Sequence, residues 1–375
     1  MADAKSIAVS QLKRYRLCRD CAERQGSRQK PGEPCYVCRG LFDQKDTVLK
    51  RMVSAASGYE YDTFLIGAML PTQIYEREDA MRARLKIRGR ESAKSQLTRE
   101  LGIAFATANR KKVDYMVPDL VINLVVDKEN NIEVSTKSRP LTLQGRYKKN
   151  APGLAQKQVR CPSCEGKGCS QCGHSGLSGF DSIEGVLAKQ IMSATKGQTP
   201  KFSWVGSEDR SSLVLGKGRP FYAKVFDPRK RKLRKIIVNN NSVVATLSPM
   251  KRAIVPSPFA VKTKIQIRCD KNILRDDLRK LKSLTGTKVK FDNRTRIGTK
   301  KIYTAISRRI DDNTFALTIL ADGGLMIKQF VGGQEYMKPN ISELVGAKCD
   351  CVTFDILDVR LQDSHSSRFQ YGVEN

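Results

Sequence analysis

Two groups of four cysteines constrain this chain more than any other feature of its sequence. In the first group, Cys18-x2-Cys21 is followed by Cys35-x2-Cys38 in a polar stretch that contains Pro31-Gly32. A two-residue gap lets both thiolates of a pair bind one ion, and two such pairs complete a tetrahedral zinc site. Four thiolates leave no coordination position open for water. We therefore predict a zinc site that holds the fold and does not catalyse.

The second group has the same paired character and lies in the middle of the chain. It consists of Cys161, Cys164, Cys169 and Cys172, with several glycines between them. The spacing again suits zinc, and the glycines permit the positive φ angles that such turns require. We predict metal here too, either in a second independent site or in a loop that uses only some of the thiols. The remaining cysteines are expected in the core or in strands: Cys269, Cys349 and Cys351.

The charge of the chain indicates a polyanionic partner. There are 68 Lys+Arg against 38 Asp+Glu, which gives a formal net charge of +30 over 375 residues. A soluble protein tolerates this self-repulsion best when it binds a polyanion such as a nucleic acid. A merely solvated basic surface is the alternative, but such surfaces usually carry acids in similar number. We expect an RNA or DNA partner.

Other function classes are excluded by what the sequence lacks. No apolar stretch approaches the ~20 residues of a membrane span, and the basic first nineteen residues lack the apolar segment of a signal peptide. We therefore expect a cytoplasmic protein with no membrane partner. Histidine occurs only at His174 and His365, which makes histidine-based catalysis improbable. No phosphate-loop or dinucleotide fingerprint is present, so no nucleotide cofactor is expected. An enzyme of this composition would rely on carboxylate, lysine or tyrosine.

The sequence divides into four parts of alternating helical and strand character. We expect a zinc module over residues 1–45, an α+β domain over 46–150, a Cys-rich connector over 151–178 and a larger α+β domain over 179–375. Within them, helices are predicted over 80–110, from 182 onward and over 272–284. Strands are predicted over 113–126, 132–143, 222–244 (a hairpin), 262–269, 315–320 and 352–359.

A dense basic run follows Phe226. It reads Asp-Pro-Arg-Lys-Arg-Lys-Leu-Arg-Lys over residues 227–235. In a chain this basic, we interpret the run as a grip for RNA phosphates. The alternative is a solvated hairpin tip.

Several short motifs follow one another in a consistent order and spacing. They are Cys35-Tyr-Val-Cys38, Pro118-Asp119-Leu, Ser182-Ile-Glu184, Gly206-Ser-Glu-Asp209, Leu215-Gly-Lys-Gly-Arg-Pro-Phe221 and Gly324-Leu-Met-Ile-Lys328. Together they resemble the archaeal and eukaryotic tRNA pseudouridine synthase family that carries a THUMP-type RNA-binding domain. The resemblance runs nearly end to end.

The resemblance implies a fold, a reaction and a partner. The fold is an N-terminal zinc module and a THUMP-containing α+β domain, followed by a catalytic domain with a mixed or antiparallel sheet. The reaction is an isomerisation (an intramolecular transfer) of uridine to pseudouridine at positions 54 and 55 in the T-arm loop of tRNA. It breaks the N-glycosidic bond, turns the uracil and rejoins it through C5. Because no redox step or external group is needed, no catalytic cofactor is implied.

The resemblance also assigns roles to particular residues. Asp209 takes the catalytic role, either as a nucleophile toward C1′ or as a base toward the sugar. Arg219, Lys264, Met326 and Lys328 fall at positions that face the substrate, and Lys328 is suited to keep Asp209 ionised.

This chain departs from the family pattern at the pocket. Ser207 stands where the family has arginine, Met326 replaces a tyrosine, and Lys264 occupies the position of a second tyrosine. Trp204 or Tyr303 would compensate for the lost rings, unless both pack in the core. Two functions therefore stay open: a pseudouridine synthase with an altered pocket, or a tRNA-binding or tRNA-folding protein on the same fold.

Overall fold

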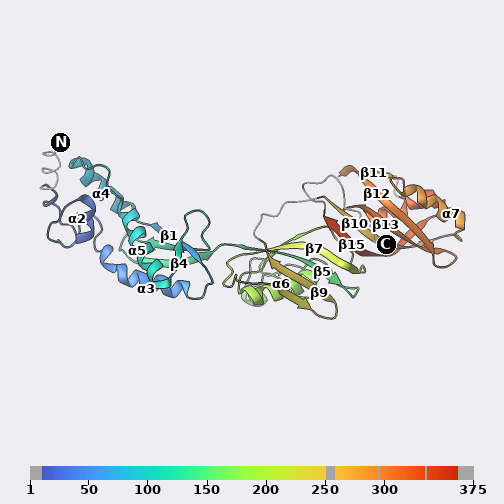
Figure 1. Cartoon of the computed structure of the whole chain (residues 1–375), viewed down its shortest axis with the longest axis horizontal. Coiled ribbons are helices and arrows are strands. Elements are labelled where there is room, and N and C mark those ends of the chain that lie inside the picture. Colours follow the sequence, from blue (N-terminus) through green and yellow to red (C-terminus); the bar gives the residue numbers. More distant parts are fainter. Residues whose placement is uncertain (1–10, 251–257, 294–295, 334–335, 362–375) are drawn as a thin grey trace. The chain divides into compact units, whose positions relative to one another are not determined.

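The computed structural model describes residues 11–250, 258–293, 296–333 and 336–361, which form two compact units (Figure 1). Unit 1 comprises Met1–Pro140 and Phe226–Lys232, and unit 2 comprises Leu141–Val225 and Leu233–Asn375. His365 lies outside the described residues. Each unit packs helices against a sheet, so the predicted α+β class is confirmed. None of the helices in these described ranges is long and apolar enough to cross a membrane.

Unit 1 is built on a mixed sheet in the order β2-β1-β3-β4. The strands are β1 (Thr63–Met69), β2 (Lys112–Val113), β3 (Leu120–Val126) and β4 (Ile132–Ser138). β1 runs parallel to β2 and β3, whereas β4 is antiparallel to β3. Alternate apolar side chains of β1 and β3 are buried, as the period of a strand with one covered face requires.

Unit 1 contains more helices than the single one that the sequence pattern predicts. They are α2 (Arg19–Gln25), the 3-10 turn η1 (Phe42–Gln44), α3 (Lys45–Ala56), α4 (Thr72–Arg84) and α5 (Ala93–Asn109). The expected single helix over 80–110 is interrupted after α4, where Gly89 adopts a φ of +67°. A new helix then begins because the side chain of Ser92 accepts a hydrogen bond from the Ser95 N–H at 3.1 Å.

Two predicted strands are also divided. The strand expected over 113–126 is broken by a turn in which Asp114 accepts hydrogen bonds from the N–H groups of Met116 and Val117. The strand expected over 132–143 is divided after β4 at Pro140, which has no N–H to donate to a ladder.

The segment Phe226–Lys232 belongs to unit 1, although its flanking strands belong to unit 2. The carboxylate of Asp227 accepts hydrogen bonds from the Tyr59 hydroxyl at 3.0 Å and from the Ser138 N–H at 2.9 Å. Arg231 pairs with Asp119 at 2.7 Å, with only 10% of its side chain exposed. The expected phosphate grip is therefore wrong for Arg231, because a carboxylate of unit 1 already neutralises it. Lys230 remains exposed.

Unit 2 is built on one long sheet in the order β14-β11-β12-β13-β10-β15-β7-β5-β9-β8, with β6 also paired to β7. Its ladders are antiparallel apart from the β15–β7 contact, where Ile356 pairs with Val214 in parallel. The strands are β5 (Leu141–Lys149), β6 (Lys201–Trp204), β7 (Val214–Val225), β8 (Ile236–Asn239), β9 (Val243–Pro249), β10 (Phe259–Cys269), β11 (Lys288–Asn293), β12 (Arg296–Arg309), β13 (Thr314–Asp322), β14 (Met337–Lys338) and β15 (Cys349–Leu361).

Short helices accompany this sheet. They are η2 (Ser170–Cys172), α6 (Ile183–Thr195), α7 (Arg275–Lys280), η3 (Leu281–Leu284), α8 (Ile327–Gly332) and α9 (Ile341–Val345). The predicted helix start at Ser182 is confirmed: its hydroxyl caps α6 by accepting from the Gly185 N–H at 3.0 Å.

The boundary between the units differs from the expected one at residue 150. β5 pairs with β7 and β9 and therefore lies in the large sheet. Its Gly-Arg-Tyr-Lys-Lys sequence is basic, but Leu143, Tyr147 and Lys149 are buried. Because polar residues of β5 are buried, the alternation of apolar and polar residues does not identify it as a strand of the large sheet.

We predict that Arg231→Gln destabilises the part of unit 1 that the 226–232 segment contacts. The substitution leaves the half-buried Asp119 carboxylate with one cation fewer, and such losses cost about 1–3 kcal/mol. Amide hydrogen exchange in β3 and β4 is the measurement, and it should become faster. Lys230→Gln, at an exposed neighbour, is the control. Equal exchange in both variants would show that this segment does not stabilise unit 1.

Candidate active site

The Gly206-Ser-Glu-Asp209 loop connects β6 to β7 and opens onto a cavity of about 380 Å³. This volume falls within the ~300–1,000 Å³ that is usual for small-molecule sites. Gly206 adopts a φ of +79°, and a Cβ there would lie 2.6 Å from the Arg219 guanidinium. The turn into the loop therefore requires glycine at this position.

The strands that form the cavity wall are distant in sequence, and most of the side chains that they contribute are apolar. β10 contributes Phe259, Val261 and Thr263, whereas β13 contributes Ile319, Ala321 and Asp322. β15 and the segment after β13 supply the remainder: Phe354, Ile356, Gly324, Leu325, Met326, Ile327, Lys328 and Gln329. A planar, uncharged group fits such a wall better than a phosphate does.

At the opening of this cavity, Asp209 forms an ion pair with a lysine. Its Oδ2 lies 2.5 Å from the Nζ of Lys328, which comes from the first turn of α8. The contact with Asp209 raises the pKa of Lys328 above its ordinary value. The Lys328 side chain is 64% exposed. It can therefore move aside when a substrate binds.

Glu208, the residue before Asp209, holds the loop in place through buried contacts. The Glu208 side chain is fully buried, and its Oε2 pairs with the Nε of Arg219 at 2.7 Å. The hydroxyl of Tyr147 donates to Glu208 at 2.6 Å. Burial, together with the Glu208 charge, raises the pKa of Tyr147 well above its usual range, so this phenol remains a donor.

Two buried cations hold the backbone of the same loop. Arg219 donates to the carbonyl oxygens of Val205 at 2.7 Å and Ser207 at 3.0 Å. The ammonium of Lys149, on β5, donates to the carbonyl of Asp209 at 3.1 Å and to that of Arg210 at 2.7 Å. Burial lowers the pKa of Lys149. These contacts fix the position of Asp209 before any substrate binds.

The residues singled out from the sequence do not all meet in this cavity. Asp209, Arg219, Met326 and Lys328 line it, but Arg219 is only 1% exposed. Its guanidinium contacts the loop, which favours a positioning role over the substrate contact that we expected. Lys264 lies outside the cavity and is exposed, because the alternation of β10 turns Thr263 toward the cavity and Lys264 away from it.

Among the described residues that line the cavity, none is a tyrosine, and its aromatic members are Phe259 and Phe354. Trp204 does not replace the missing ring, because it stacks on Phe202 with centroids 5.0 Å apart. Tyr303 instead donates its hydroxyl to Asp322 at 2.7 Å. The sequence analysis missed Phe259, since no motif marks this residue and only the strand register brings it to the cavity that contains Asp209.

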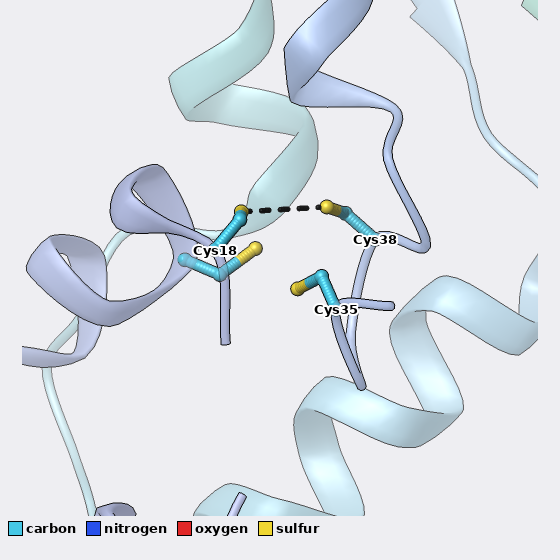
Figure 2. Close-up of side chains that lie close together, drawn as sticks. Cys18, Cys35 and Cys38 are labelled. Carbon is cyan, nitrogen blue, oxygen red and sulfur yellow. Dashed lines mark hydrogen bonds between the residues drawn. The ribbon is translucent and has the colours of Figure 1, made fainter. Parts of the chain in front are cut away.

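The first cysteine group assembles as predicted (Figure 2). The sulfur atoms of Cys18, Cys21, Cys35 and Cys38 lie within 4.8 Å of one another, and all four residues are buried. Arg24 donates to the Cys21 Sγ at 3.3 Å, so a cation lies beside the sulfur cluster. Buried thiolates without a cation between them would repel one another, so this geometry fits a metal ion.

The second cysteine group also assembles, with Cys161, Cys164, Cys169 and Cys172 within 4.8 Å of one another. Backbone N–H groups point at its sulfurs: that of Gly168 lies 3.1 Å from Cys164, and that of Gly176 lies 3.2 Å from Cys172. Such N–H to sulfur contacts are typical of metal-binding turns. His174 is not a member of this cluster of described residues.

Known proteins resemble the chain over nearly its whole length. The family model described as Pus10, C-terminal, matches residues 142–360, and that of the archaeal Pus10 THUMP domain matches residues 48–125. The tRNA pseudouridine synthase Pus10 of Nitrosopumilus maritimus is 34% identical, over 95% of this chain and 98% of its own length. The protein of the same name from Cenarchaeum symbiosum is 32% identical, over 89% of this chain and 83% of its own length.

The likeness to solved structures is much lower. A crystal structure of a Cbf5-Nop10-Gar1 complex matches with a TM-score of 0.30 and 11% identity, over 46% of this chain and 44% of that chain. A likeness of this size supports no inference about the site.

Proposed function

Because the chain belongs to the Pus10 family of tRNA pseudouridine synthases, we propose that it converts uridine to pseudouridine at positions 54 and 55 in the T-arm loop of tRNA. Asp209 is the catalytic residue in this proposal. The observation that carries it is the position of the Asp209 carboxylate, 2.5 Å from the Lys328 ammonium and in a cavity to which the strands contribute mostly apolar side chains.

The cavity supports this chemistry because the target nucleotide must leave its stack before the glycosidic bond can break. Loops give up a base most readily, which agrees with a T-arm substrate. An apolar wall accepts the uracil ring, and the Asp209 carboxylate is then available at the ribose. It either attacks C1′ or removes a proton from the sugar. The detached uracil turns and rejoins through C5 while the wall keeps it in place. The reaction needs no external group.

A second function has one observation in its favour. No tyrosine lines the described cavity, although the family is expected to place one against the base. A protein that binds or folds tRNA on the same fold would tolerate that loss. Its binding would rest on the net charge of +30 and would weaken with added salt. The two functions differ in one result, because only the first makes pseudouridine.

We also propose that both cysteine groups hold structural zinc and that the protein works in the cytoplasm. Four thiolates at mutual distances within 4.8 Å suit a tetrahedral Zn²⁺, which would be bound by Cys18, Cys21, Cys35 and Cys38 and by Cys161, Cys164, Cys169 and Cys172. Zinc would have a structural role in these segments, since four thiolates leave no coordination position open. Reduced thiols require a reducing compartment.

The test of the catalytic proposal is Asp209→Asn. The amide keeps the size of the side chain but is neither a nucleophile nor a base, so pseudouridine should disappear from an unmodified tRNA transcript. Carbodiimide treatment followed by primer extension maps the product. The exposed Asp350→Asn variant should retain full activity. Pseudouridine formation by Asp209→Asn would remove this residue from the chemistry, and no product from the unaltered protein would favour the tRNA-binding function.

The test of the zinc proposal compares three cysteine variants. Cys21→Ser and Cys164→Ser should each lose about one equivalent of zinc per chain, measured by atomic emission, because a tetrahedral site needs all four thiolates. Cys351→Ser lies outside both groups and should lose none. Cys21→Ser should also expose unit 1 to proteolysis, since metal binding is coupled to folding. Unchanged zinc content in either of the first two variants would overturn the assignment for that group.

A further inference from the structure

A buried glutamine lies beside the loop that carries Asp209, and the proposed chemistry gives it no role. Gln156 is 7% exposed and belongs to the segment between β5 and the second cysteine group. Its Nε2 donates to the hydroxyl oxygen of Tyr147 at 2.9 Å, to the carbonyl oxygen of Gly206 at 3.2 Å and to Oε2 of Glu208 at 3.3 Å. An amide nitrogen carries two hydrogens, so these three acceptors share them.

The neighbours of this amide fix which of its two ends faces the loop. The Gly206 carbonyl and the Glu208 carboxylate accept hydrogen bonds and do not donate them, so the nitrogen of Gln156 must face them. The same nitrogen also determines the direction of the Tyr147 hydroxyl. Because Gln156 offers this hydroxyl only a donor, Tyr147 gives its own hydrogen to Glu208, at 2.6 Å. An apolar side chain at position 156 would remove all three contacts of the amide.

The backbone around Gln156 is itself held between a helix and the loop. The carbonyl oxygen of Gln156 accepts from the Glu184 N–H at 3.0 Å, in the first turn of α6. Three residues earlier, the Gly153 N–H donates to the Arg210 carbonyl at 2.7 Å, and the Arg210 Nε donates to the Gly153 carbonyl at 3.1 Å. This segment therefore contacts the loop on both sides of Asp209.

We propose that Gln156 is a positioning residue for pseudouridine formation: by donating to Glu208 and Gly206, it holds the loop in the arrangement that places Asp209 in the cavity. This inference rests on the proposed function. Gln156 is not among the described residues that line the cavity, so it acts through the loop and not on the nucleotide. Its loss should slow the chemical step and leave tRNA binding unchanged.

Two substitutions at this position separate positioning from packing. Gln156→Met has nearly the same length but removes the donor. Gln156→Glu keeps the shape and replaces the donor by a carboxylate that faces Glu208. The single-turnover rate at saturating protein should fall by about tenfold to 10²-fold in Gln156→Met, because a displaced catalytic group reacts slowly. It should fall further in Gln156→Glu, since the two carboxylates repel each other. The affinity for tRNA, measured by filter binding, should not change.

Gln158→Met is the matched control. Gln158 is a buried glutamine of the same segment, but its Nε2 donates to Asp181 at 2.7 Å and its Oε1 accepts from the Ser182 hydroxyl at 2.6 Å. These partners lie outside the loop, so the control loses buried hydrogen bonds of the same kind and should keep the rate of the unaltered protein. Unchanged rates in both Gln156 variants, or an equal fall in Gln156→Met and Gln158→Met, would overturn the inference.

A double-mutant cycle tests whether Gln156 acts through Glu208. If it does, Gln156→Met combined with Glu208→Gln should lose less rate than the product of the two separate losses, because both changes release the same contact. Losses that multiply would mean that the two residues act independently. The inference would then fail while the proposed function stands.

Trp204 supplies a readout that does not depend on activity. It is the only tryptophan of the chain and the last residue of β6, and its ring lies edge-on to that of Tyr147 with centroids 5.6 Å apart. Its fluorescence should shift to longer wavelength in Gln156→Met and not in Gln158→Met, because a displaced loop exposes the indole to water. An unshifted spectrum in Gln156→Met would contradict the inference. If the unaltered protein makes no pseudouridine, the proposed function fails, and this spectrum still decides whether Gln156 holds the loop.

Discussion

The site depends on the buried ion pair between Glu208 and Arg219. Neither side chain is more than 1% exposed, and the two nearest atoms lie 2.7 Å apart. Breaking such a pair from one side costs about 3–5 kcal/mol, because the remaining charge stays buried without a partner. The same guanidinium also binds two loop carbonyls, and Lys149 binds two more. The Asp209 carboxylate can therefore face the cavity while the backbone of its loop remains fixed.

This arrangement explains how the chain differs from its family pattern without losing the shape of the site. The arginine expected beside Glu208 is Ser207, whereas Lys328, which belongs to a motif that this chain shares with the family, pairs with Asp209. The expected pocket tyrosine is Met326, and the aromatic face comes from Phe259. Phe259 and Met326 come from different parts of the chain, and both line the same cavity because the sheet order brings β10, β13 and β15 together.

Some features of the fold and of the site could be predicted from local sequence patterns, and others could not. Cysteine spacing predicted both clusters, because the two cysteines of one metal-binding turn lie close together in the sequence. The cap at Ser182 was equally local. By contrast, Lys264 was assigned to the pocket although the register of β10 turns it outward. Arg231 was misread because its partner, Asp119, lies far away in the sequence. Long-range pairing and register are not visible in one sequence.

Glu208→Gln tests the central claim most directly. The amide has nearly the same shape but removes the charge that Arg219 needs, so the loop should shift while tRNA still binds. Small displacements of a catalytic group cost about 10²-fold in rate. We predict a fall of this order in the single-turnover rate of pseudouridine formation, with unchanged tRNA affinity and zinc content. A rate within about twofold of the unaltered protein would show that the buried pair does not position Asp209.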